Sequence, residues 1–168
     1  MSKRRLTFEN EGFYHLYNRG VNREKIFFDN ENYLFFIRNL RRYLVPVMDI
    51  IAYCLMPTHY HLLVCVGSAD NDIEGPIQKY CPAARSMQRF SISYTKAINK
   101  RYDRVGALFQ GAYKAKYINN LDHSRRIIPY IHQNPVSAEL VQNATDWKYS
   151  SARVYEGIEE PGFLKPLI

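Results

Sequence analysis

The spacing of apolar residues along the chain predicts an alternation of strands and helices. Four strands are expected, at residues 13–18, 47–55, 59–66 and 112–118. Three helices are expected, from the capping residue Asp29 to about Leu44, from Ile77 to Arg101, and from the capping residue Asp122 to just before Pro135. Residues 67–76 carry three acids and two glycines and are expected to form an exposed loop. The residue pattern of the C-terminal tail predicts no definite helix or strand.

The order of these elements, β-α-β-β-α-β-α, is typical of a split βαβ sandwich of the ferredoxin-like kind. We therefore expect an α+β fold, with an antiparallel sheet and its helices on one face. The chain has 168 residues, of which 46% are hydrophobic and 23% charged. These values favour one compact domain over residues 1–168, with a sizeable core and an ordinary soluble surface.

Neither a membrane nor an oxidising compartment is indicated. The first seven residues have no apolar segment behind their charges, which argues against a secretory signal. The most apolar stretch, 43–66, is interrupted by prolines, an aspartate and histidines, too often for a membrane span. Three cysteines without C-x-x-C spacing give neither a disulfide framework nor a zinc ribbon. We expect a cytoplasmic protein without a membrane partner.

Charge and aromatic content point toward nucleic acid. The net charge is +7, and 14 residues are tyrosine. Residues 76–117 contain nine basic side chains and a single acid, Asp103. On the helix predicted there, four basic residues fall within about 60° of one another, opposite the apolar side: Arg85, Arg89, Lys96 and Lys100. We expect this basic stripe to contact DNA phosphates, although a solvated helix face would have the same pattern.

The segment 56–64, Met-Pro-Thr-His-Tyr-His-Leu-Leu-Val, contains two histidines that enter a predicted strand. Because residues two apart in a strand share a face, His59 and His61 can converge on one metal ion. Two imidazoles alone make a weak site, so a third ligand would have to come from elsewhere in the chain. Two histidines that merely form hydrogen bonds at a strand end would show the same spacing.

The flanking residues make this segment resemble the His-hydrophobic-His (HUH) motif of single-tyrosine transposases of bacterial insertion sequences. It is most similar to that of the REP-associated tyrosine transposases. Residues 14–23 resemble the first strand and turn of that family, 130–136 its tyrosine helix, and 147–151 its C-terminal signature. The three matches occur in the expected order and, with the HUH segment, cover residues 12–155.

The resemblance implies that Tyr130 is the nucleophile and that Asn134 completes a metal site with His59 and His61. Residues four apart on a helix share a face, which is consistent with that pairing. An amide oxygen and two imidazoles suit Mn²⁺ or Mg²⁺. His132 and Gln133 are alternative ligands nearby, and the prolines at 129 and 135 predict a kink or break in this helix.

The resemblance therefore implies a DNA transposase, a metal-dependent endonuclease that cleaves and transfers single-stranded or hairpin DNA through a 5′-phosphotyrosine intermediate. It leaves a homodimer open, because insertion-sequence relatives are dimers and REP-associated ones need not be. One alternative is a catalytically inactive regulator that binds structured DNA or RNA on the same fold. Another is a zinc hydrolase built on His59 and His61, which would form no covalent adduct with DNA.

Overall fold

The computed structural model describes residues 8–67 and 81–167. Its elements are β1 (Phe13–Arg19), a 3-10 turn (Val21–Arg23), α1 (Asn30–Asn39), a π-helical turn (Leu40–Leu44), β2 (Met48–Met56), β3 (His59–Val66), α2 (Pro82–Arg101), β4 (Lys114–Ile118), α3 (Leu121–Ser137), a second 3-10 turn (Ala144–Asp146) and α4 (Ala152–Tyr155). Most of the predicted loop at 67–76 and the predicted helix start at 77–80 lie outside the described residues. Within those residues, no helix has the length and apolarity needed to cross a bilayer.

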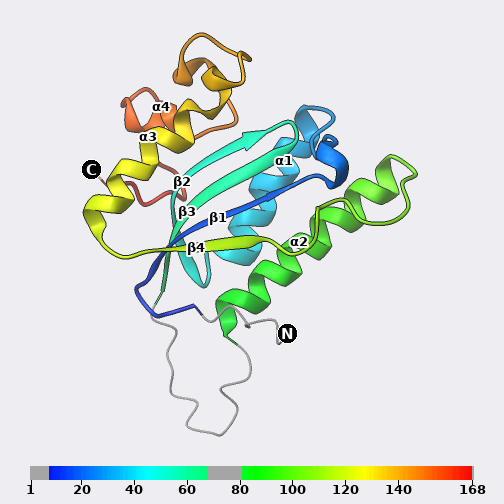
Figure 1. Ribbon diagram of the computed structural model, residues 1–168, viewed down its shortest axis with the longest axis horizontal. Helices are drawn as coiled ribbons and strands as arrows, with labels where there is room; N and C mark the ends of the chain where they lie inside the picture. Colours follow the sequence, from blue (N-terminus) through cyan, green and yellow to red (C-terminus); the bar gives the residue numbers. More distant parts are fainter. Residues whose placement is uncertain (1–7, 68–80, 168) are drawn as a thin grey trace, which may run out of the picture.

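The strands form one antiparallel sheet in the order β2-β3-β1-β4 (Figure 1). The two central strands are β3 and β1, which pair with each other from Arg19↔His59 to Phe13↔Cys65. This order is that of the ferredoxin-like split βαβ arrangement. The predicted α+β class, with helices packed on an antiparallel sheet, is confirmed.

The main core lies between the sheet and the pair α1–α2. Every second residue of β3, beginning at Tyr60, points toward this pair, and Tyr60, Leu62 and Val64 are fully buried. Phe36 of α1 and Tyr94 of α2 meet there with their rings edge to face, 4.9 Å between centroids. The rings of this core pack in offset and perpendicular contacts, which adds to the free energy gained from burial alone.

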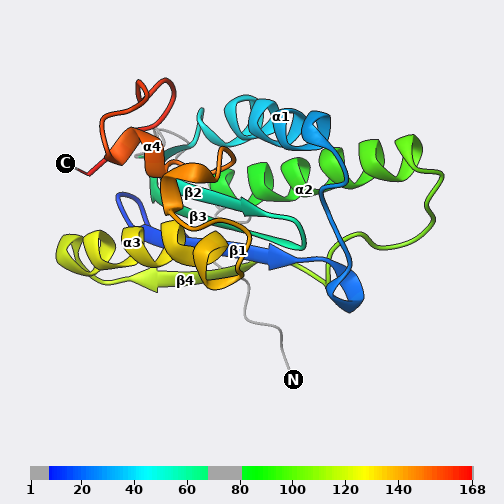
Figure 2. The same cartoon turned by 90° about the horizontal axis from the view of Figure 1, so that it is seen from above.

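The third long helix, α3, lies on the opposite face, which corrects the expectation that all helices share one face. Its Ile128 and Ile131 pack in a second apolar cluster with Leu63 of β3 and Ile118 of β4. In Figure 2, α1 and α2 lie on the far side of β2 and β3 from α3. The reason is that residues of β3 are apolar on both sides of the strand at 62–64, so that each face can bury a helix.

The ends of α3 also differ from the expectation. The helix begins two residues earlier than predicted, because Asn120 rather than Asp122 forms the N-cap: its side chain accepts a hydrogen bond from the His123 amide at 2.7 Å. It then continues past Pro129 and Pro135 to Ser137. By contrast, the predicted cap of α1 is present, since the Asp29 side chain accepts from the Asn32 amide at 3.0 Å.

The C-terminal tail, for which the sequence predicted no element, joins both layers to the edge strand β2. The Trp147 indole donates to the Leu55 carbonyl at 2.9 Å, and the Tyr149 ring stacks on Tyr33 of α1 at 3.6 Å. The Ser151 hydroxyl accepts from the Tyr53 amide at 2.9 Å. The tail thereby holds α3 and α1 to opposite sides of one strand.

Phe36→Ala should lower the free energy of unfolding by about 3–5 kcal/mol, because it leaves a cavity among four aromatic rings of the main core. Leu34→Ala is the matched control on the same helix, where the side chain is 39% exposed and should cost less than about 1 kcal/mol. Urea unfolding followed by circular dichroism measures both. Equal losses in the two variants would contradict this placement of the core.

Candidate active site

His59 and His61 lie on the face of β3 that α3 partly covers, as the alternation along a strand predicts. Their ring centroids are 5.1 Å apart, and the rings are nearly perpendicular, at 86°. His61 is 8% exposed, whereas His59 at the start of the strand is half-buried. The two imidazoles are therefore neighbours on one face of the sheet, at the start of β3.

Each of these rings has its Nδ1 atom held by a neighbour. His61 Nδ1 lies 2.9 Å from Nε2 of His15, a buried residue of β1, and His59 Nδ1 lies 3.0 Å from the Thr58 hydroxyl. The second nitrogen of each ring, Nε2, is left for another partner. An imidazole fixed through one nitrogen presents the other in a set direction, which is the arrangement found around metal-binding histidines.

Asn134 is oriented by the proline that follows it. Pro135 has no amide hydrogen, so the Ile131 carbonyl loses its helical partner four residues on. The Asn134 side-chain nitrogen donates to that carbonyl at 3.2 Å and to the Tyr130 carbonyl at 2.9 Å. The side chain replaces the missing donor, which explains why α3 continues through Pro135 instead of ending before it.

With its nitrogen occupied, the Asn134 amide presents its oxygen to His59. Burial lowers the pKa of His59, a hydrogen bond that His59 makes with the Asn134 side chain raises it, and the Arg19 charge lowers it again. Because the Asn134 nitrogen is engaged by the Tyr130 and Ile131 carbonyls, the amide oxygen is the atom of this side chain that is left to accept from the ring. Asn134 is thus brought to the histidines across about seventy residues of sequence.

Tyr130 stands beside His61 and His15 and is 58% exposed. Its ring centroid lies 6.1 Å from that of His61 and 6.2 Å from that of His15, with the ring steeply inclined to both. Ile128 and Ile131 hold this part of α3 on the sheet, while the tyrosine projects from the exposed side. The arrangement is formed within one chain.

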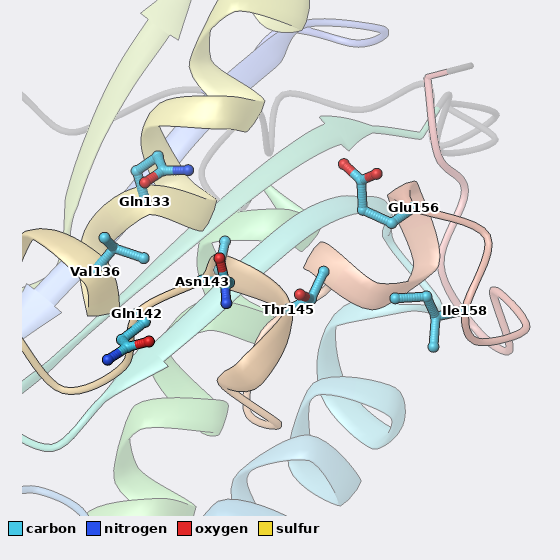
Figure 3. A pocket seen from close by; sticks show the side chains of 8 residues that line it. Gln133, Val136, Gln142, Asn143, Thr145, Glu156 and Ile158 are labelled. Carbon is cyan, nitrogen blue, oxygen red and sulfur yellow. The ribbon is translucent and has the colours of Figure 1, made fainter.

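The two alternative ligands face elsewhere. His132 is buried on the other flank of α3, where its Nε2 lies 2.8 Å from the Ser151 hydroxyl. Gln133 lines an open cavity of about 480 Å³ between α3, the second 3-10 turn and the α4 segment (Figure 3). This cavity has a polar lining that includes Asn143 and Glu156.

The basic stripe lies on the opposite layer from the histidines. All four of its side chains are exposed on α2, which packs against the main core with Phe90 and Tyr94: Arg85, Arg89, Lys96 and Lys100. A strand of DNA held at His61 would have to pass the edge of the sheet to reach them. Their contact with phosphates stays a prediction.

Sequence reasoning missed a second group of side chains on the histidine face. His15, Tyr17 and Arg19 occupy alternate positions of β1, and Lys114 and Lys116 face them from β4. The period of two in both strands was a visible signal, but the pairing register that brings them beside His61 was not. In the part of the chain that the structure describes, no three His, Cys, Asp or Glu side chains form a metal-binding group; the predicted set uses an amide instead.

Comparison with solved structures shows the same fold in a DNA-bound protein. The chain superposes on a REP-associated tyrosine transposase bound to a REP hairpin with a TM-score of 0.67, at 18% identity, covering 100% of this chain and 99% of that one. A candidate transposase from Deinococcus radiodurans R1 has a TM-score of 0.43 at 21% identity, covering 80% and 97%. No protein-family model and no curated protein matches the sequence. The resemblance inferred from the motifs is confirmed at the level of the fold.

Three imidazoles on this side of the sheet are kept neutral by burial. Burial lowers the pKa of His15 to about 4, that of His61 to about 3 and that of His132 to about 4. The unfolded chain binds protons at these groups below about pH 6.5, whereas the folded chain does not. Their contribution to stability is therefore complete above about pH 6.5 and is lost as the pH falls toward 4.

His132→Gln should flatten this dependence, because glutamine can still form a hydrogen bond with the Ser151 hydroxyl but does not titrate. The difference in unfolding free energy between pH 7 and pH 5 should shrink by about 2 kcal/mol relative to the unsubstituted chain. Urea unfolding at the two pH values, followed by Trp147 fluorescence, measures the change. A loss of stability that is equal at both pH values does not affect this difference. An unchanged difference in His132→Gln would refute the assignment of part of the pH dependence to His132.

Proposed function

We propose that the protein is a transposase-like enzyme that cleaves and rejoins single-stranded or hairpin DNA with Tyr130 as its nucleophile. The observation that carries the proposal is the convergence of Tyr130, Asn134, His59 and His61 on one open face within a single chain. The full-length likeness to a transposase bound to a DNA hairpin supports it. The positive net charge of +7 suits a polyanionic substrate.

The donor set fits a divalent cation such as Mn²⁺ or Mg²⁺. His59 and His61 each offer Nε2, because their Nδ1 atoms are engaged by Thr58 and His15. Asn134 offers an amide oxygen beside His59. Two imidazoles and one amide oxygen leave coordination positions for phosphate oxygens. A bound ion would supply positive charge to offset the negative charge that develops on the phosphate.

Tyr130 is exposed enough to meet a phosphate held on that face. Its phenolic oxygen would form a bond to phosphorus as the bond from phosphorus to the 3′ oxygen breaks, and the phenol proton would pass through solvent to the leaving 3′ oxygen. The products are a 5′-phosphotyrosine and a free 3′-hydroxyl. Since the phosphodiester energy is retained in the adduct, the reverse step can join a strand without a nucleotide cofactor.

Tyr130→Phe should abolish the covalent adduct and strand cleavage while leaving DNA affinity within about twofold, because the ring and its packing are retained but the attacking oxygen is lost. Labelled single-stranded oligonucleotides carrying a REP-type hairpin, incubated with Mn²⁺ and resolved by denaturing electrophoresis, give both readouts. Tyr117→Phe, an exposed tyrosine on the opposite face of β4, is the matched control and should remain active.

The outcomes test the choice of nucleophile and separate the proposed enzyme from the two alternative functions. An adduct that persists in Tyr130→Phe would identify another tyrosine as the nucleophile. Cleavage without any adduct would favour the metal-dependent hydrolase. Binding without cleavage in the unsubstituted chain would favour the inactive regulator of structured nucleic acid.

His61→Ala should weaken Mn²⁺ binding by more than about tenfold, because it removes a ligand whose other nitrogen is already fixed by His15. Calorimetric titration of the chain with Mn²⁺ measures the affinity without DNA and without turnover. His123→Ala is the control, because His123 lies at the start of α3, beside Asn119 rather than beside the candidate site. Equal affinities in the two variants would exclude this metal site.

A further inference from the structure

Beside the proposed metal ligands, a row of side chains crosses the sheet from β3 to β4. Tyr17 of β1 is paired with His61 on one side and with Lys114 on the other. Directly paired residues in an antiparallel sheet project from the same face, and neighbouring strands lie about 4.8 Å apart. His61, Tyr17 and Lys114 therefore stand side by side, and the adjacent pair His15–Lys116 continues the row along the strands.

The aromatic member of this row is partly open to solvent and is bordered by cationic side chains. Tyr17 is half-buried, and the Lys114 ammonium lies 5.9 Å from the centre of its ring. The centroids of the His15 and His61 rings lie 5.0 Å and 6.0 Å from that of Tyr17, with the ring planes tilted by 33° and 31° to it. A ring held in this way presents a fixed surface on which a planar group can stack.

The charge around Tyr17 is of one sign. Arg19, Lys114 and Lys116 are exposed, and β1, β3 and β4 contain no Asp or Glu. None of the three takes part in an ion pair with another residue among 8–67 and 81–167. Lysines on an edge strand such as β4 also prevent edge-to-edge pairing, but that role does not require an aromatic ring between them and the histidines.

We propose that this row binds the nucleotide next to the cleaved phosphate in single-stranded DNA, with its base stacked on Tyr17 and its own phosphate against Lys114 and Lys116. The inference rests on the proposed function, because the cleaved phosphate is placed at His59, His61 and Asn134. Base stacking on an aromatic side chain is tolerant of sequence and is worth about a 5- to 150-fold gain in affinity per base. The row thus holds the strand in register with Tyr130 whatever base occupies it.

The test compares two single strands of equal length and charge, a 20-nucleotide oligothymidylate and an abasic 20-mer. Affinities are measured by fluorescence anisotropy in a chelator, on the Tyr130→Phe background, so that neither metal nor cleavage contributes. Tyr17→Leu should weaken binding of the thymidylate strand about 5- to 100-fold and leave the abasic strand unaffected. Tyr17→Phe, which keeps the ring, should bind as the background protein does.

Two further variants separate stacking from charge. Tyr117→Leu removes an exposed tyrosine from the opposite face of the sheet and should change neither affinity. Lys114→Gln should weaken both strands by the same factor and reduce the slope of log affinity against log salt by about 0.7.

The results distinguish this inference from the function on which it rests. If Tyr17→Leu binds both strands as tightly as the background protein while the unsubstituted chain still forms a Tyr130 adduct, the nucleotide site is refuted and the enzyme assignment stands. If Tyr17→Leu weakens both strands equally, the ring supports the surface and does not stack on a base. If the background protein binds neither strand, the single-stranded DNA assignment and this site fail together.

Discussion

The alternation of side chains along β3 places the main core on one face of the strand and the histidines of the candidate site on the other. Tyr60, Leu62 and Val64 point into the layer of α1 and α2, while His59 and His61 point to the face of α3. A slip of one residue in the pairing of β3 would bury both histidines and expose the core. Because β3 is held between β2 and β1 on both edges, the free energy of the large core also fixes the direction in which the imidazoles project.

The face of the sheet that α3 covers has two parts, an apolar cluster and the candidate site. One end is closed by α3, whose Ile128 and Ile131 bury the sheet near Leu63. The other end stays open and carries the imidazoles, Tyr17 and the lysines of β4. Tyr130 and Asn134 lie at the boundary, so the helix that seals the apolar end also supplies the groups that complete the polar end.

Local patterns predicted the elements well, and long-range pairing limited the rest. The strand at 59–66 was predicted to the residue, because its β-forming run is bounded by Pro57-Thr58 and Gly67. The face that α3 covers could not be predicted, since β3 is apolar on both sides. The predicted end of α3 was wrong, because proline usually ends a helix by removing a backbone donor. Here the Asn134 side chain supplies the missing donor, and the helix continues. The two histidines were visible as a pair, but the contact of His15 with His61 depends on a cross-strand register that no local pattern specifies.

The hydrogen bonds of Asn134 restrict what chemistry position 134 can have. An aspartate has almost the same shape and would be a stronger ligand for a divalent cation, yet it has no hydrogen to donate. It would leave the Ile131 carbonyl unpaired and set a negative charge against two carbonyl oxygens. Since Pro135 withholds the backbone donor, the side chain must give hydrogen bonds at one end and accept at the other. The helix thus favours a neutral amide at position 134, and the proline that follows it restricts the charge of the candidate site.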